Sequence, residues 1–303
     1  MMRDFVSCFS EKVVEIRDPK RNSGENAQDM IACVYQTHVA GYTQIITVTW
    51  MKNNTAGRRF SIQIDNSNDH CRGFFKLENT PWLSSKKKGS KILGSGSGKV
   101  GIHWDLSLAR FETGVPEPME KYYVAVVVDL ELVLLVGDMI GEAQKKIKIA
   151  HDHYNSLSNV MLIAKKKYMS GESKHYSTRS KFCNNGLTHD ITINCETSDG
   201  VKEPYLEIRI DKKRIVLVER LKWNFRGNQT ILIDHLPVEV FWDVHSWVFG
   251  SSNRRLRPAM FMFQTSGHSS ERAFPWYYHQ KFRESQMNGL AFSLIIFAST
   301  EVE

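Results

Sequence analysis

The sequence has little cysteine, and what it has is not arranged for covalent or metal chemistry. Among 303 residues there are five cysteines: Cys8, Cys33, Cys71, Cys183 and Cys195. Their number is odd, their spacing is wide and no C-x-x-C pair occurs, so neither a disulfide framework nor a zinc site is indicated. We therefore expect a reducing compartment, no metal and no cofactor.

Long apolar runs are also missing. The first residues, "MMRDFVSCFSEKVVEI", carry charges throughout and lack the apolar core of a secretory signal. The most apolar stretch, residues 122–138, contains Asp129 and Glu131 and is rich in β-branched residues. That composition favours two strands over a membrane-spanning helix. The sequence therefore predicts a cytoplasmic or nuclear protein without a transmembrane segment.

Motifs of catalysis and nucleotide binding are equally scarce. There is no G-x-S-x-G, and the Gly-rich stretch at 94–98 lacks a following G-K-[ST] and precedes a strand pattern. His151 and His153 fall in a predicted helix, where residues two apart do not share a face. Cys195 and His189 are close in sequence, but cysteines in strands are usually buried and inert. We predict no catalytic residue, and an enzyme of unknown class is only our third hypothesis.

Short stretches with strand periodicity are abundant instead. Residues 59–65, for example, alternate Phe60, Ile62 and Ile64 with polar residues. Similar stretches, separated by turns, run through most of the chain. The sequence therefore predicts an all-β fold: an antiparallel sandwich or a closed barrel, built from two homologous β units, with one helix in the connector.

Changes in composition along the chain predict four segments. Residues 1–27 are polar and should form a loose N-terminal arm, and residues 28–137 the first β unit. Residues 138–180 should form a helix, beginning at Asp138, and a Lys- and Ser-rich connector. Residues 181–303 should form the second β unit, and we expect both units to pack as one globular body.

An internal repeat relates residues 44–111 to residues 189–249. Each copy has an Ile-x-Ile-Asp strand, a tryptophan before a basic loop with glycine, a Trp-Asp pair, and a phenylalanine seven residues after that tryptophan. The matching residues are Trp82 and Trp223, Trp104-Asp105 and Trp242-Asp243, and Phe111 and Phe249. A repeat of this length predicts two copies of one β supersecondary unit.

The stretch "VEVFWDVHSWVF" holds Asp243 and His245 two positions apart. Strand alternation would place both on one face, as a catalytic dyad or half of a metal site requires. In the other copy Asp105 recurs, but Ser107 stands where the second copy has His245. We therefore interpret the Trp-Asp pairs as a structural motif that closes a strand, and keep His245 as a candidate site residue.

Positive charge exceeds negative charge. Lysine and arginine number 40 and aspartate and glutamate 33, a net charge of +7. This balance favours an anionic partner: a membrane surface, nucleic acid or an acidic protein. The candidate binding residues follow the repeated tryptophans: Lys86, Lys87, Lys88, Lys91 and Arg226. The alternative is that these lysines and arginines are ordinary solvated charge.

These observations make a non-enzymatic binding or adaptor module the leading hypothesis. The runner-up is a carrier of a small apolar ligand, because a closed barrel of this size could hold one as lipocalin-like barrels do. An interior apolar cavity would favour the carrier, and a filled core would favour the adaptor.

Several stretches together resemble one plant-specific family. They are "ITVTW", "PWL" with its lysine-rich loop, "WDLS", "HDITI", "LKWNFRGNQTI" and "FWDVHSWVF". The family is catalogued as domain of unknown function 868, and the resemblance extends from about residue 2 to residue 298. It implies a plant source and one full-length homologous unit, but no activity, cofactor or catalytic residue. The hairpin turns differ from the family's usual Asp-Gly, being Asp129-Leu130 and Asp211-Lys212.

Overall fold

In a computed structural model, strands make up most of the residues that the structure describes. The described residues are 28–39, 42–53, 57–66, 75–78, 87–93, 99–147, 160–171, 173–182, 186–197, 203–250, 258–265 and 292–300. They contain nineteen strands and two helices, in agreement with the predicted all-β class. Neither described helix has the length and apolar content to cross a bilayer. The arm predicted at 1–27 lies outside the described residues.

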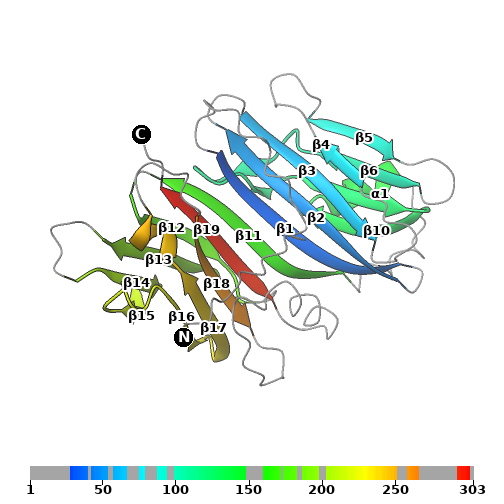
Figure 1. The fold of residues 1–303 in the computed structure, drawn as a ribbon. Helices are drawn as coiled ribbons and strands as arrows, with labels where there is room; N and C mark the ends of the chain where they lie inside the picture. The colour runs from blue at the N-terminus through cyan, green and yellow to red at the C-terminus, as the bar shows by residue number, and fades with distance from the viewer. Residues whose placement is uncertain are drawn as a thin grey trace, which may run out of the picture.

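The largest element is a sheet of nine strands that runs the length of the molecule (Figure 1). In spatial order it contains β16 (Arg226–Ile233), β17 (Leu236–Asp243), β18 (Ala259–Thr265), β19 (Ser293–Thr300), β11 (Met161–Gly171), β1 (Gln28–Val39), β2 (Tyr42–Asn53), β3 (Gly57–Asn66) and β4 (Phe75–Glu78). The strand β11 is its centre. It pairs antiparallel with β1 and parallel with β19.

Two smaller sheets and a strand pair complete the fold. One sheet contains β10 (Glu131–Gly137), β9 (Tyr123–Val128), β6 (Val100–Asp105) and β5 (Lys88–Leu93). The other contains β12 (His175–Ser180), β13 (His189–Glu196), β14 (Tyr205–Ile210) and β15 (Lys213–Val218). The pair consists of β7 (Arg110–Phe111) and β8 (Pro118–Glu120). The described sheets are all open, so the closed barrel that we kept as an alternative is not formed by these residues.

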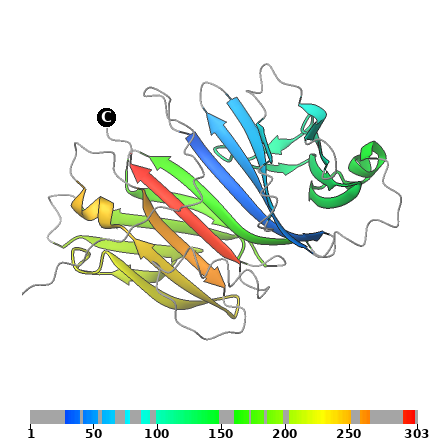
Figure 2. The same ribbon diagram turned by 45° about the vertical axis from the view of Figure 1, so that its right-hand side comes forward.

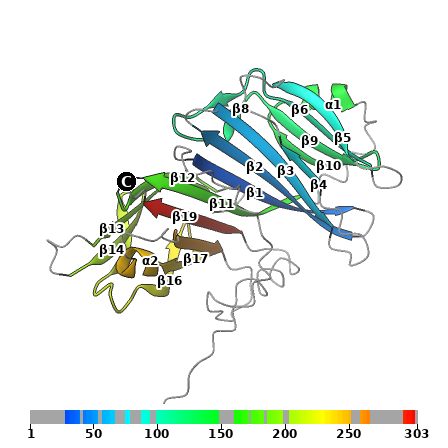
Figure 3. The same cartoon turned by 45° about the horizontal axis from the view of Figure 1, so that its top comes forward.

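Each four-stranded sheet packs against one half of the large sheet and encloses its own core. Figure 3 shows the N-terminal sheet pair, β1–β4 with β5, β6, β9 and β10. Residues such as Trp50, Phe60 and Val124 form the core between these two sheets. In the C-terminal sheet pair, β12–β15 with β16–β19, Leu206 and Phe261 belong to a second cluster. The apolar alternation seen in the sequence therefore supplies the facing side chains of both cores.

The stretch predicted as a connector has a different role. Residues 165–180 form most of β11 and all of β12. Lys165 and Lys167 alternate along β11 with residues that face the other side, as strand geometry requires. Lysine-rich composition is typical of exposed loops, which is why this strand was not predicted. Here the lysine side chains face the inside of the molecule.

A short helix, α1 (Ile140–Ile147), lies within the stretch that was predicted to be helical from Asp138 onward. Its buried Ala143 packs on the outer side of β9, against Tyr123 and Ala125. The Asp138 carboxylate accepts a hydrogen bond from the Tyr122 N–H at 3.1 Å and so ties the helix entry to β9. The predicted continuation beyond Ile147, with His151 and His153, lies outside the described residues. The second helix, α2 (His245–Phe249), lies at the other end of the molecule (Figure 2).

A tryptophan packs directly on a glycine of the neighbouring strand in both sheet pairs. Trp104 lies opposite Gly89, and Trp242 lies opposite Gly227. A β-carbon on Gly89 would lie 2.7 Å from the Trp104 ring, and one on Gly227 would lie 2.4 Å from the Trp242 ring. Since both distances are shorter than van der Waals contact, glycine is required at both positions. Gly89 and Gly227, the glycines of the two predicted basic loops, therefore form part of the packing around Trp104 and Trp242.

We expect Gly227→Ala to lower the free energy of unfolding by about 2 to 3 kcal/mol, because the added methyl group must displace the ring of Trp242 in a packed core. Gly141→Ala is the matched control. Nothing lies within 4 Å of its β-carbon, and it lies in α1, where alanine gains about 0.5 to 1 kcal/mol over glycine. Urea unfolding measures both. An unchanged stability of Gly227→Ala would contradict the steric role.

Candidate functional site

The basic residues next to the repeated tryptophans are held by the repeated aspartates. The Lys88 Nζ lies 2.6 Å from Asp105 Oδ2, and the Arg226 Nε donates to Asp243 Oδ2 at 2.8 Å. The hydrogen bond to Asp105 raises the pKa of Lys88. These two cations therefore act first as cross-strand partners within the fold, as the interpretation of the Trp-Asp pairs implies.

The two basic regions do not converge. Lys87 and Lys91 are exposed at β5, the edge of one four-stranded sheet, whereas Arg226 begins β16, at the far edge of the nine-stranded sheet. Figure 1 shows β5 (cyan) and β16 (yellow) at opposite ends of the molecule. Lys86 and Trp82 lie outside the described residues. A single binding site cannot be made from both regions.

His245 and Asp243 do not share a strand face. The strand β17 ends at Asp243, and His245 is the first residue of α2. The strand alternation that we extrapolated therefore ends before it reaches His245. The Asp243 Oδ1 accepts the His245 N–H at 3.1 Å, as Asp105 accepts the Ser107 N–H at 3.0 Å. The exposed His245 ring packs instead against Phe225, with ring centres 5.1 Å apart.

Trp223 differs from the other repeated tryptophans that the structure describes. Trp104 and Trp242 are buried, but Trp223 is 85% exposed. We had grouped it with them as a structural residue. It lies in a turn in which its N–H donates to the Arg220 carbonyl at 2.8 Å. The side chain is therefore presented to solvent by a hydrogen-bonded turn.

Cations and aromatic rings surround this turn. We call the group the Trp223 surface and define it by Arg220, Lys222, Trp223, Phe225 and Arg226. Arg220, Lys222 and Arg226 are exposed, and the Arg226 guanidinium lies 5.5 Å from the centre of the Phe225 ring. Arg220 and Lys222 form no ion pair with any described residue. The Trp223 surface thus combines free positive charge with an exposed indole.

A solvent-open hollow of about 640 Å³ adjoins the Trp223 surface. It lies between β15 and β16, which are edge strands of the two sheets of the C-terminal pair. Leu217 of β15, Gln229 of β16 and Trp242 contribute to its lining together with Arg220 and Arg226. Gln229 spans it, donating from Nε2 to the Ile215 carbonyl at 3.4 Å.

A buried histidine, His189, links two hairpin turns, and no sequence motif predicted this role. The His189 Nδ1 lies 2.6 Å from Asp211 Oδ2, and its Nε2 lies 2.9 Å from Asp234 Oδ2. Asp211 and Asp234 are first residues of two-residue turns with positive φ, at 50° and 49°, typical of type I′ hairpins. One turn joins β14 to β15 and the other joins β16 to β17. His189 therefore connects the two sheets of the C-terminal pair.

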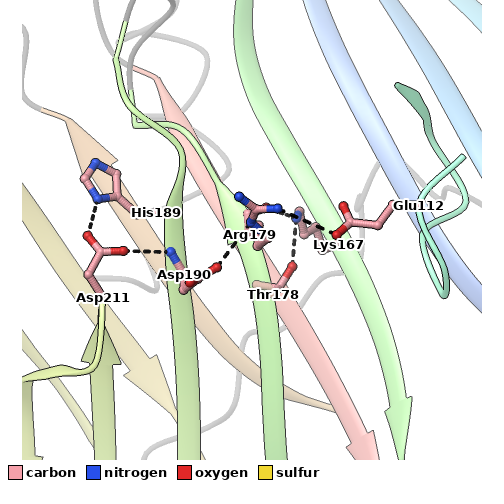
Figure 4. A network of polar contacts seen from close by, with 7 residues as sticks. All are labelled: Glu112, Lys167, Thr178, Arg179, His189, Asp190 and Asp211. Carbon is pink, nitrogen blue, oxygen red and sulfur yellow. Dashed lines mark hydrogen bonds and ion pairs between the residues drawn. The ribbon is translucent and has the colours of Figure 1, made fainter. Parts of the chain in front are cut away.

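This histidine belongs to a longer polar network (Figure 4). The Asp190 N–H donates to Asp211 at 3.0 Å, and the Asp190 carboxylate lies 3.2 Å from the Arg179 guanidinium. Arg179 also lies 3.6 Å from Glu112, which belongs to the N-terminal half. The network therefore extends from the end of the C-terminal sheet pair to the loop before β8.

Lys167 lies beside this network and is almost fully buried. Its Nζ donates to Thr178 Oγ1 at 2.8 Å and to the Arg179 carbonyl at 2.5 Å. Burial, with the repulsion of Lys165, lowers the pKa of Lys167 to about 8. Lys165 is itself paired with Glu117. These lysines join the two halves and have no opening toward a substrate among the described residues.

The remaining reactive side chains are shielded. Cys33 and Cys195 are buried free thiols. Burial raises the pKa of Cys33 and raises that of Cys195 to about 12, so both are protonated and unreactive at neutral pH. No three His, Cys, Asp or Glu side chains of the described residues form a ligand set for a metal ion. The Trp223 surface and its hollow are the best candidate site.

A family model described as plant protein of unknown function, DUF868, matches residues 26–300. The chain belongs to this family. Searches of curated proteins and of solved structures returned no match. The match confirms the resemblance seen in the sequence, and it assigns no activity to the DUF868 fold.

The His189 bridge should make stability depend on pH. Burial opposes the charged ring, but hydrogen bonds to Asp211 and Asp234 outweigh it and raise the pKa of His189 above 6.5. The stabilisation that charged His189 contributes to the folded state is therefore complete below about pH 6.5, and it is lost as pH rises through the folded-state pKa of His189. We expect His189→Gln to lose about 1 to 2 kcal/mol at pH 6 and clearly less at pH 9.

Urea unfolding at both pH values measures this difference. His175→Gln, an exposed histidine on the neighbouring strand, is the control and should change stability by less than about 0.5 kcal/mol. A loss of equal size at pH 6 and pH 9 would show that the bridge does not depend on the charge of His189.

Lys167 should show the opposite dependence. Because its folded-state pKa of about 8 lies below 10.5, the buried charge costs stability below pH 8, and that cost disappears as pH rises toward 10.5. The stability of the wild type relative to Lys167→Met should therefore rise by on the order of 2 kcal/mol between pH 7 and pH 10. Unfolding curves at both pH values test this, with the exposed Lys145→Met as control. A constant difference would contradict the lowered pKa.

Proposed function

We propose that this DUF868 protein is a non-enzymatic binding module whose Trp223 surface contacts an anionic partner. The single observation that carries the proposal is the 85% exposure of Trp223, which follows Arg220 and Lys222 in the same turn. Folding gains nothing from an indole in water, whereas tryptophan and arginine are the residues that most often dominate binding energy at interfaces. An exposed indole beside cations without an ion-pair partner among the described residues therefore supports recognition rather than stability.

The lysines at β5 are the weaker candidate. Lys88 is engaged by Asp105, and the region is remote from Arg226. Lys87 and Lys91 remain exposed and can add attraction at a distance, but no exposed aromatic ring accompanies them among the described residues. We therefore assign them a secondary role in attracting the partner.

Support for the other hypotheses is slight. A carrier needs an enclosed apolar cavity, whereas the two cores are filled by large side chains such as Trp50, Phe60 and Phe261. The hollow beside the Trp223 surface is open and partly polar. The buried thiols of Cys33 and Cys195 are consistent with our expectation of the cytosol or nucleus.

We further propose that the two sheet pairs are copies of one unit. The order β1-β2-β3-β4 corresponds to β12-β13-β14-β15, and β10-β9-β6-β5 corresponds to β19-β18-β17-β16. The Trp-on-Gly contact and the ion pair to aspartate occur at matching places in both. On this view, Trp223 corresponds to Trp82 of the first copy, which also precedes a basic stretch and lies outside the described residues.

Charge reversal at Arg220 and Lys222 tests the proposed function. The probes are phosphatidylserine-containing vesicles, poly(U) RNA and polyglutamate, each titrated at low salt. We expect the wild type to bind at least one probe and Arg220→Glu/Lys222→Glu to weaken that binding by about tenfold or more, which is about 1.4 kcal/mol. Trp223→Ala should weaken it by a similar factor.

The control is Lys145→Glu/Lys146→Glu on α1, which changes the net charge by the same amount at the other end of the molecule. It should retain binding to within about twofold. If the wild type binds none of the probes, or if the control loses as much as the Trp223-surface variant, the proposed site is wrong.

A further inference from the structure

The strand β16 has a regular row of backbone groups that no described strand pairs with. It pairs with β17 without interruption from Arg226 to Ile233, and no described strand lies on its other side. The side chains of Asn228, Gln229 and Thr230 are exposed, so this edge is open to solvent. An edge of this kind can accept a further strand.

The identity of the free groups follows from one hydrogen bond. The Val244 N–H donates to the Phe225 carbonyl at 2.9 Å, so the backbone of Phe225 faces β17. The N–H and C=O of one residue point to the same side, and neighbouring residues alternate. Gln229 and Ile231 therefore also face β17. The outward groups belong to Arg226, Asn228, Thr230 and Leu232.

Other edge strands carry the features that protect against strand addition. Lys88 and Lys91 lie on β5, and Lys213 and Arg214 lie on β15. Charged side chains of this type, proline and bulges are the usual protections of a sheet edge. The stretch "RGNQTILI" of β16 has no lysine, no proline and no break in register, its one charged residue, Arg226, is paired with Asp243, and its Leu232 is 74% exposed. Its edge is the least protected of the three.

A strand added to β16 would lie beside the hollow between β15 and β16. Alternate side chains of that strand would face Leu217 and Trp242, and the others would face solvent. One end of the strand would lie at the Trp223 surface, where Arg220 and Lys222 have no described acidic partner. The open edge of β16, the hollow beside it and the cations of the Trp223 surface therefore form one continuous surface.

We propose that the anionic partner is an extended acidic segment of a protein, which adds to the nine-stranded sheet as a strand beside β16. This inference rests on the proposed function and names its partner. A row of alternating N–H donors and C=O acceptors matches a polypeptide backbone, and neither RNA nor a bilayer presents one. Acidic side chains are what Arg220 and Lys222 would select.

The test uses a fluorescently labelled decapeptide of alternating valine and glutamate with blocked ends. Fluorescence anisotropy measures its binding to the full chain. We expect it to bind the wild type, and we expect Thr230→Pro to weaken binding by about tenfold or more, because proline removes an outward N–H. Thr230→Val keeps that N–H and should bind within about twofold of the wild type. The same peptide methylated on alternate backbone nitrogens should bind about tenfold more weakly.

Thermal unfolding verifies that Thr230→Pro is folded. Asn228→Pro, whose N–H also faces outward, replaces it if the first variant is unstable, and the methylated peptide tests the inference without any change in the protein. A peptide with lysine in place of glutamate should not bind at the same concentration.

The outcomes separate the two proposals. If Thr230→Pro and backbone methylation leave binding unchanged while Arg220→Glu/Lys222→Glu weakens it, strand addition is wrong and the Trp223 surface stands. The same conclusion follows if poly(U) or phosphatidylserine vesicles bind and the peptide does not. If the wild type binds neither the peptide nor the other probes, both proposals are overturned.

Discussion

The pairing of β11 with β1 on one side and with β19 on the other is the interaction on which the rest of the molecule depends. It merges two sheet pairs, each with its own core, into a structure with one continuous sheet. This pairing buries Lys165 and Lys167. The free-energy cost of burying their charges is offset by Glu117 and by hydrogen-bond acceptors of β12. Charges buried in this way are tolerated only when partners are present, and here the partners come from both halves.

This central strand also determines where binding can occur. Since the two halves extend in opposite directions from β11, their matching edges face away from each other. The two Trp-Asp pairs consequently lie apart, each in its own sheet pair, and do not assemble a composite site. Beside the pair of the C-terminal sheets lie an exposed indole, two cations without an ion-pair partner among the described residues, and an edge strand without lysine.

Much of the strand content could be predicted from the sequence because apolar alternation is a local signal. The repeat led to the interpretation of the Trp-Asp pairs as structural, and in the structure each aspartate pairs with a cation of the neighbouring strand. Three features depend on distant contacts and were missed. Burial of Lys167 needs acceptors of β12, exposure of Trp223 needs the turn at Arg220, and the His189 bridge needs two turns that are remote in sequence.

His245 was misplaced for a local reason. Strand alternation was extended past Asp243, where the chain turns into α2. The sequence contains no proline or glycine at that point, and the aspartate that ends the strand was read as one more alternating residue. The hydrogen bond from the His245 N–H to Asp243 shows that the aspartate itself marks the boundary.

The position of β19 has a consequence for biosynthesis. The strand lies between β11 and β18 in the middle of the large sheet, yet residues 293–300 are the last described strand of the chain. On the ribosome, β11 can pair with β1 long before β19 has been made, so its second edge stays open while the C-terminal half is translated. The parallel pairing that finally closes this gap is non-local and slow to form. Until then, the nascent chain exposes an unpaired sheet edge at β11, the strand that later joins the two halves.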